Sequence, residues 1–287
     1  FILKNEIKKE SIITLEIFQL NQSVELIEQN TEKQLLEIID LISKSTSDLL
    51  VFGENNYPFL IETKSIPRIQ NILKNGQSVI IGGTRLIDKK YFNTFMQIEN
   101  SKIVFFDKKI LVPFGEFLPF RKYLNFMQSI SGSNDYSKGI NKRLINIDNE
   151  LSYIPIICYE IIFYWNLLNK KNNNADLIIN ITNDVWFGNF IGPYQHLYLT
   201  KLRASEFNKF IIRVSNNGIS AIIDQNGKII NFLGLNNKIN YKQNIKIVSD
   251  KNFYLTHFYL KIYFSIVLIL LIIIILIRNY EKTKSKI

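Results

Sequence analysis

Short apolar runs alternate with polar segments along most of the chain, which predicts strands interleaved with a few helices. Apolar residues at helical spacing between 35 and 42, preceded by Asn30 or Thr31 as a cap, predict one helix. A second helix is predicted over about 193–209, and the pair Asn226 and Gly227 predicts a tight hairpin. The predicted strands are 48–52, 78–81 closed by two glycines, 91–98, 102–106, a run that ends at 157, 176–181, 210–214, 219–223 and 228–232.

Polar or charged side chains recur just past the ends of these predicted strands. Glu54 follows the run 48–52, Cys158 follows the run that ends at 157, and Asp184 follows 176–181. In an α/β sheet the carboxyl ends of parallel strands meet at one edge, and functional sites are built there. The pattern therefore predicts a layered α/β domain with its site at that edge.

The C-terminal pattern is different, because it is a single apolar stretch. Ile262 to Ile277 is interrupted only by Ser265, and an extension back to Phe258 makes 20 residues. As a helix this stretch is about 30 Å long, which matches the hydrocarbon core of a bilayer. The sequence therefore predicts a folded domain over 1–255, and a transmembrane helix with a short tail over 256–287.

The two ends of the chain bear on membrane topology. Under the positive-inside rule, the basic residues after the apolar stretch place the tail in the cytoplasm and the domain outside. Phe1 is followed within a few residues by a polar segment, with no signal peptide or apolar entry segment. Because the first residue is also not methionine, we expect a fragment or processed chain whose upstream part carried the membrane entry. The basic residues are Arg278, Lys282, Lys284 and Lys286.

Composition narrows the possible chemistry. The formal net charge is +10, but the lysines are scattered among isoleucines and asparagines and form no signature of nucleic-acid binding. Cys158 is the only cysteine, which excludes an intrachain disulfide and leaves a thiol that is either inert or reactive. His196 and His257 are the only histidines, so a histidine-rich metal site has no support. We expect no nucleic acid, no metal and no other cofactor.

Residues past the strand ends include a candidate nucleophile, base and cation. Cys158 lies where a strand gives way to a helical pattern, and the free amides at a helix start stabilise a thiolate and a nearby oxyanion. Glu54 supplies a base, Lys108 supplies a positive charge, and Glu116 is a second carboxylate that could hold the lysine. Each residue also has a purely structural reading, because a free cysteine is usually a buried apolar residue and Glu or Lys is usually a solvated charge.

Motifs in a fixed order along the chain resemble a known family. They cover about residues 45 to 232 and are followed by the apolar C-terminal stretch. The sequence closely resembles the apolipoprotein N-acyltransferases, a membrane branch of the nitrilase (carbon-nitrogen hydrolase) superfamily. The motifs are Asp107 and Lys108 with 111–116 (LVPFGE), Cys158 with Tyr159 and Glu160, 183–188 (NDVWFG) with 192–196 (GPYQH), Arg203 with Ala204, and 215–218 (SNNG).

The resemblance implies a nitrilase-like αββα sandwich followed by a C-terminal transmembrane helix. It places the chain in a bacterial inner membrane, with the catalytic domain in the periplasm and the tail in the cytoplasm. The implied reaction takes a fatty acyl group from a membrane phospholipid as a cysteine thioester, then passes it to the N-terminal amine of a diacylglyceryl-cysteine lipoprotein, without a cofactor. The implied catalytic triad is Glu54, Lys108 and Cys158, with supporting roles for Glu116, Tyr159 and Glu160, although Glu160 also fits a simple first-turn acid of a helix.

Two departures from the family pattern leave alternatives open. The usual Trp-Pro-Glu around the catalytic glutamate reads Phe52, Gly53, Glu54 here, and the membrane helices that precede the domain in the family are not in this chain. One alternative is a membrane-tethered amidase or nitrilase that uses the same triad. The other is an inactive or split remnant that acts only with a separate polypeptide carrying the missing helices.

Overall fold

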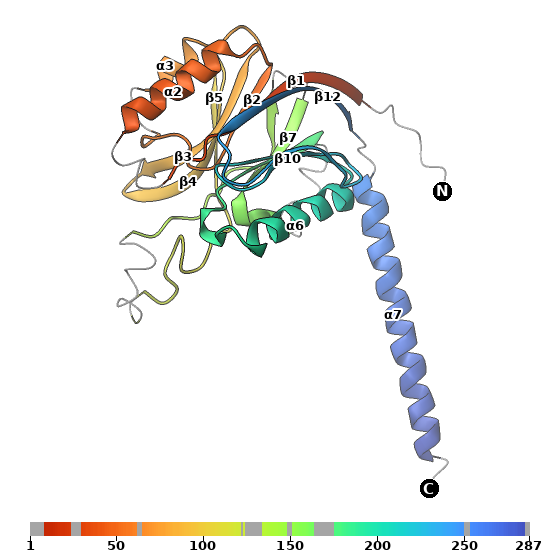
Figure 1. The fold of residues 1–287 in the computed structure, drawn as a ribbon. Helices are drawn as coiled ribbons and strands as arrows, with labels where there is room; N and C mark the ends of the chain where they lie inside the picture. Colours follow the sequence, from red (N-terminus) through yellow and green to blue (C-terminus); the bar gives the residue numbers. More distant parts are fainter. Residues whose placement is uncertain are drawn as a thin grey trace.

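Two six-stranded β-sheets packed face to face form the centre of the protein, described here by a computed structural model (Figure 1). The structure describes residues 9–23, 30–61, 65–121, 123, 134–147, 151–163, 175–249 and 253–284. Helices lie on the outer faces of both sheets (Figure 1). The described part of the chain therefore has the αββα layering that the resemblance implied.

The first sheet has the strand order β12-β1-β2-β3-β4-β5. Strands β1, β2 and β3 are parallel, and the other neighbours are antiparallel. Helices α2 (Thr31–Lys44) and α3 (Ile66–Gln70) cover its outer face. The strands are β1 (Lys9–Gln19), β2 (Leu49–Phe52), β3 (Ser78–Ile87), β4 (Lys90–Ile98), β5 (Ile103–Asp107) and β12 (Ile239–Ser249).

The second sheet has the strand order β11-β10-β9-β8-β7-β6, and β7, β8 and β9 are parallel. Helix α6 (Ile191–Phe207) covers its outer face. Two 3-10 helices, η2 (Cys158–Ile162) and η3 (Val185–Phe187), follow β7 and β8. The strands are β6 (Ile145–Ile147), β7 (Leu151–Ile157), β8 (Leu177–Thr182), β9 (Phe210–Ser215), β10 (Ser220–Ile223) and β11 (Ile229–Leu233).

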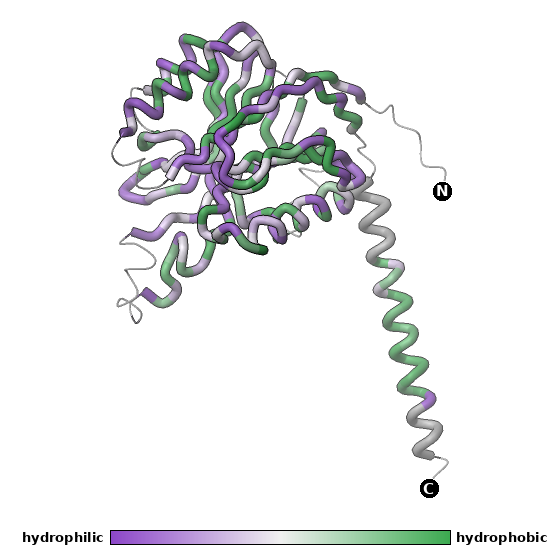
Figure 2. Tube along the Cα trace, in the orientation of Figure 1, coloured by the Kyte–Doolittle hydropathy of each residue, from purple (hydrophilic) through white to green (hydrophobic). Residues whose placement is uncertain are grey.

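Strand β2 shows why the central strands read as continuous apolar runs. Leu49 and Val51 pack in the core between the two sheets, whereas Leu50 and Phe52 pack in the core under α2 and α3. A strand that is buried on both faces has no polar side to alternate with. Figure 2 shows hydrophobic residues along the strands between the layers, whereas the outer helix α2 carries both hydrophobic and hydrophilic residues.

The predicted strands are present, with one correction. The run 78–81 was expected to end at Gly82 and Gly83, but β3 continues through both glycines to Ile87. A Cβ atom on Gly82 would lie 2.7 Å from the Cα atom of Glu54, and one on Gly83 would lie 3.0 Å from the Cβ atom of Tyr57. The glycines therefore let the segment after β2 approach the strand closely, and do not terminate it.

Two further differences concern elements that the hydrophobic pattern did not reveal fully. The long strands β1 and β12 were not predicted, and they pair with each other in antiparallel register from Lys9 opposite Ser249 to Gln19 opposite Ile239. The predicted helix after Cys158 is a five-residue 3-10 helix in the described residues, and its expected continuation to Trp165 lies outside them.

Helix α7 (Phe253–Lys284) leaves the sandwich and extends away from it (Figure 1). Its described side chains from Ile262 to Ile277 are mostly exposed and apolar, which gives the continuous hydrophobic segment in Figure 2. Among the residues whose side chains are described, no helix combines the length and the apolar content needed to cross a membrane. The side chains of 253–261 and 279–284, and all of 285–287 with Lys286, lie outside the described residues.

Candidate active site

The candidate catalytic residues lie at the edge of the sandwich where the parallel strands end. Glu54 follows β2, Lys108 follows β5 and Cys158 follows β7. The backbone amide of Glu54 donates to the carbonyl oxygen of Thr182, the last residue of β8, at 3.3 Å. This contact joins the ends of the two sheets, so residues from both can meet at one site.

Lys108 is the centre of a buried ionic cluster. Its side chain is 1% exposed, and its Nζ lies 2.9 Å from Oε1 of Glu116 and 3.4 Å from Oε1 of Glu54. Burial alone would lower the pKa of Lys108, but the charges of Glu54, Cys158 and Glu116 hold that pKa above its ordinary value. The lysine is therefore a fixed cation at neutral pH.

Asn93 on β4 belongs to the same cluster, although the sequence analysis assigned no role to it. Its Nδ2 donates one hydrogen bond to Oε1 of Glu54 and one to Oε1 of Glu116, both at 2.7 Å. Its Oδ1 is buried and accepts no hydrogen bond from the described residues. Asparagine is depleted in strands, so a single Asn within an aromatic and apolar strand pattern was the available signal.

Glu54 is buried, and the pKa of its carboxyl group is above the ordinary value. Burial, and then the nearby charge of Glu116, raise its pKa, while Lys108 and the hydrogen bond from Asn93 oppose the rise. The residue before it, Gly53, is a departure from the family pattern, and its position has a steric reason. A Cβ atom there would lie 2.7 Å from the backbone nitrogen of Asn216. A side chain at 53 would therefore push apart the two segments that meet behind Glu54.

Cys158 lies at the junction of β7 and η2 and is 7% exposed. Its φ of 48° is in the left-handed region, which is strained for a residue with a side chain and costs about 1–3 kcal/mol. Burial, and then the charge of Glu54, raise the pKa of its thiol to about 12, against the opposing charge of Lys108. The thiol is therefore protonated at neutral pH, and it needs a base at the moment it attacks.

Glu160 is close to the nucleophile in sequence but makes its contacts elsewhere. It pairs with Arg143 at 2.6 Å and accepts the backbone amides of Ile157 and Lys109. Burial would raise its pKa, but Arg143 and the amides hold it below the ordinary value. Glu160 thus ties the segment after Lys108 to the start of η2, and Arg143 is a buried partner that the sequence did not reveal.

Tyr159 contributes an aromatic contact beside the nucleophile. It is half-buried and packs edge to face against Phe163, with ring centroids 4.9 Å apart.

In the described residues, no group of three or more His, Cys, Asp or Glu side chains could hold a metal ion.

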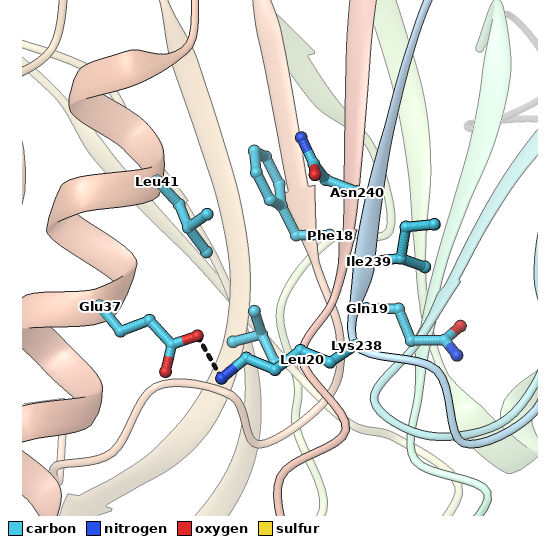
Figure 3. Close-up of a pocket in the computed structure, with 8 residues that line it drawn as sticks. All are labelled: Phe18, Gln19, Leu20, Glu37, Leu41, Lys238, Ile239 and Asn240. Atoms are coloured by element: carbon cyan, nitrogen blue, oxygen red, sulfur yellow. Dashed lines mark ion pairs between the residues drawn. The ribbon is translucent and has the colours of Figure 1, made fainter.

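A separate cleft lies away from this cluster, between α2 and the ends of β1 and β12 (Figure 3). It has a volume of about 280 Å³, and an ion pair between Glu37 and Lys238 lies at its side. Both charged groups of that pair are partly exposed to solvent. The cleft contains none of the candidate catalytic residues, so the site is defined by the charged cluster.

Comparisons with known proteins identify the family of this chain. Residues 15–243 match the carbon-nitrogen hydrolase family. A protein of Rickettsia typhi named apolipoprotein N-acyltransferase is 39% identical over 212 residues, which are 69% of this chain and 42% of that protein. The chain thus spans less than half the length of such relatives.

Solved structures with low sequence identity share the fold. The glutamine-dependent NAD+ synthetase of Acinetobacter baumannii superposes with a TM-score of 0.63 at 15% identity, over 84% of this chain and 48% of that one. A carbon-nitrogen hydrolase superfamily protein of Xanthomonas campestris superposes with a TM-score of 0.62 at 15% identity, over 85% of this chain and 93% of that one. With the family match over most of its length and relatives at 33–39% identity, this chain belongs to the carbon-nitrogen hydrolase family and resembles its apolipoprotein N-acyltransferases.

Proposed function

We propose that residues 1–255 are the catalytic domain of an apolipoprotein N-acyltransferase, with Glu54, Lys108 and Cys158 as its catalytic triad. The observation that carries the proposal is the buried cluster of Lys108 with two carboxylates, next to the only thiol of the chain. The acyl donor is a membrane phospholipid, and the acceptor is the N-terminal amine of a diacylated lipoprotein. The similarity to proteins of that name supports this choice of substrates.

In the first half-reaction, Glu54 takes the proton of the Cys158 thiol as the sulfur attacks the carbonyl carbon of a phospholipid ester. The carbonyl oxygen becomes an oxyanion, which the ammonium group of Lys108 stabilises. When the ester C–O bond breaks, the leaving alcohol takes the proton from Glu54 and the acyl group remains on sulfur. The raised pKa of Glu54 suits a group that must accept and return a proton.

In the second half-reaction, the lipoprotein amine attacks the thioester carbon and gives a proton to Glu54. The C–S bond breaks, and the departing thiolate recovers that proton as Cys158. Glu116 supports both steps, because it keeps Lys108 paired at 2.9 Å while Glu54 is transiently neutral. We assign Tyr159 and Glu160 to the support of the loop that presents Cys158.

Two apolar surfaces support a membrane location. We place α7 across the bilayer, with its basic end in the cytoplasm and the catalytic domain in the periplasm of a bacterial inner membrane. The start of α6 and the preceding η3 expose aromatic residues, including Trp186 at 75% and Phe190 at 86% exposure. Tryptophan and tyrosine favour the interface between lipid and water, so this surface suits a site that takes a lipid from the bilayer.

Intact-mass analysis tests the acyl-enzyme directly. The full chain in detergent is mixed with 1-palmitoyl-2-oleoyl phosphatidylethanolamine, and we expect the mass to rise by one acyl group on Cys158. Hydroxylamine should remove the adduct, and Cys158→Ala should prevent it. A synthetic diacylated lipopeptide should then accept the acyl group only when its N-terminal amine is free. An adduct that persists in Cys158→Ala contradicts the proposal.

A second candidate is a membrane-tethered amidase, which the match to carbon-nitrogen hydrolases favours. The two activities share the acyl-enzyme and differ in what attacks it, water or an amine. An amidase would release free fatty acid from the acylated chain within minutes in the absence of lipopeptide. A transferase should keep its thioester until the amine is added.

A further inference from the structure

Three buried titratable side chains next to the nucleophile take no part in the proposed acyl transfer. Asp184 follows β8, His196 is on α6 and Arg213 is on β9, and each is at most 3% exposed. Nδ1 of His196 lies 2.9 Å from Oδ1 of Asp184, and Nη2 of Arg213 donates to Oδ2 of Asp184 at 2.7 Å. Such a cluster is costly to bury.

The other nitrogen of the His196 ring reaches the nucleophile. Nε2 lies 3.3 Å from the backbone carbonyl oxygen of Cys158. The same residue has the left-handed backbone conformation, with a φ of 48°. A side-chain residue persists in that conformation only when its surroundings fix it. Contact with the carbonyl group is a direct means of fixing it.

The contact is a hydrogen bond only when Nε2 carries a proton, because a carbonyl oxygen can only accept. Nδ1 can accept at the same time, since Nη2 of Arg213 lies 3.2 Å from it. Burial, and then the charge of Arg213, lower the pKa of His196, so the ring is neutral at pH 7.5. With its proton on Nε2, the neutral ring donates to Cys158 and accepts from Arg213 at Nδ1, whereas a proton on Nδ1 would be donated to Oδ1 of Asp184 at 2.9 Å. Nη2 of Arg213 also donates to Asp184, and its positive charge lets the unprotonated Nδ1 lie beside that carboxylate. Phe187, whose ring centroid is 5.5 Å away, packs edge to face against the imidazole and limits its rotation.

We propose that His196 keeps its proton on Nε2 and acts as a positioning residue, which holds the Cys158 carbonyl group and thereby aims the sulfur at Glu54 and Lys108. This inference rests on the proposed role of Cys158 as the acyl carrier. It assigns to α6 a part in catalysis that involves no contact with the substrate.

Alkylation of Cys158 by iodoacetamide tests the proposal in the full chain, because there is no other cysteine. The amide nitrogen of His196→Gln reaches about as far as Nε2, whereas the side chain of His196→Asn reaches only as far as Nδ1. We expect His196→Asn to slow alkylation at pH 7.5 by about 100-fold, which is typical for a misplaced reacting group. We expect His196→Gln to react at least about tenfold faster than His196→Asn, because it restores the hydrogen bond.

Equal rates for the two variants overturn the proposal. Alkylation of His196→Asn faster than wild type also overturns it, because a purely structural loss would loosen the site and expose the thiol. The assay contains no phospholipid, so its outcome is separate from that of the acyl-adduct experiment. If phosphatidylethanolamine fails to acylate the wild-type chain, the proposed function falls, and the alkylation result still decides the role of His196.

A second measurement needs no variant at position 196. The chain has two histidines, so ¹⁵N-histidine labelling gives signals from two rings, and His257→Gln assigns them. Two-bond ¹H–¹⁵N correlations show which nitrogen of a neutral ring carries the proton. We expect the proton of His196 on Nε2 at pH 7.5. A proton on Nδ1 overturns the proposal, because Nε2 would then have nothing to donate to the Cys158 carbonyl.

Discussion

Replacing Lys108 with methionine tests the role of its positive charge, because the change removes the ammonium group and keeps the length of the side chain. At separations of 2.9 and 3.4 Å, each carboxylate attracts the lysine by about 5–6 kcal/mol at an effective dielectric constant of about 20. One pKa unit corresponds to about 1.4 kcal/mol, so the loss of even half of this attraction raises the pKa of Glu54 by about two units. Glu54 would then keep its proton to a higher pH and would take the thiol proton less readily.

Loss of the oxyanion partner adds to this effect, and removal of one such group typically costs about 10²- to 10³-fold in rate. We expect single-turnover thioester formation by Lys108→Met, followed by intact mass, to fall by at least that factor. The sign of the pH effect is fixed: the residual rate should rise with pH, because Glu54 regains its charge above its raised pKa. Thermal unfolding of each variant is measured first, since breaking a buried ion pair also lowers stability by about 3–5 kcal/mol.

The matched control is Lys109→Met. The Nζ of Lys109 lies over the Phe106 ring, 6.0 Å from its centroid, and takes no part in the carboxylate cluster. We therefore expect little change in rate at that position. Equal losses at Lys108 and Lys109, or an unchanged pH profile in Lys108→Met, would refute the reasoning, because the register of this segment decides which lysine faces the carboxylates.

Four further predictions concern the surroundings of the site. Asn93→Leu removes the hydrogen bond to Glu54, and we expect the acid limb of the pH–rate profile to move up by about one to two units, since hydrogen bonds to charged groups contribute about 1.5–3 kcal/mol. Gly53→Ala should lower the free energy of unfolding by about 1–3 kcal/mol in urea and slow acylation, because its Cβ overlaps the backbone nitrogen behind Glu54. Glu160→Gln should lower the free energy of unfolding by about 3–5 kcal/mol at pH 7, because it leaves a buried guanidinium unpaired. External protease applied to spheroplasts should digest the domain, if it faces the periplasm.

Each of these has a control or a contrary outcome. Gly115→Ala is the matched control for Gly53→Ala, because its Cβ would make only ordinary contact at 3.4 Å. We expect it to change the free energy of unfolding little. The folded-state pKa of Glu160 is lowered, so its contribution is present above the ordinary value of 4.5 and is lost as the pH falls through the folded value. The difference between wild type and Glu160→Gln should therefore shrink below that pH, and a difference that grows there contradicts the assignment. An unshifted pH–rate profile in Asn93→Leu would refute the role given to its hydrogen bond. A domain that resists external protease until the spheroplasts are lysed would refute the periplasmic orientation.

The strands that deliver Glu54 and Cys158 could be predicted because burial on both faces leaves a continuous apolar run in the sequence. The same physics explains why β12 was missed. It runs along the edge of the first sheet, and its buried Ile245 and Ile247 alternate with exposed Asn244 and Lys246, so its composition is that of a polar segment. Its identity as a strand depends on pairing with β1, which is more than 200 residues away in the chain.

The chemistry of the site was predictable only for groups whose type is uncommon in the chain or was named by the family resemblance. Cys158 is unique, whereas Asn93 and Arg143 are ordinary polar residues with no local pattern. Their roles arise from carboxylates that lie 39 and 17 positions away in sequence, at Glu54 and Glu160. A short window of sequence does not contain that information, because each contact forms only when separate strands of one sheet come together.

The pairing of β1 with β12 also governs where the chain enters and leaves the sandwich. Lys9 lies opposite Ser249, and α7 starts at Phe253 on the same side of the molecule (Figure 1). Residues 9 and 249 are therefore neighbours, and the chain between them forms a closed loop. A fluorescent donor placed ahead of Lys9 and an acceptor early in α7 would stay close while the domain is folded. Their separation would increase sharply only when β1 parts from β12, so the fluorescence would report the opening of this strand pair.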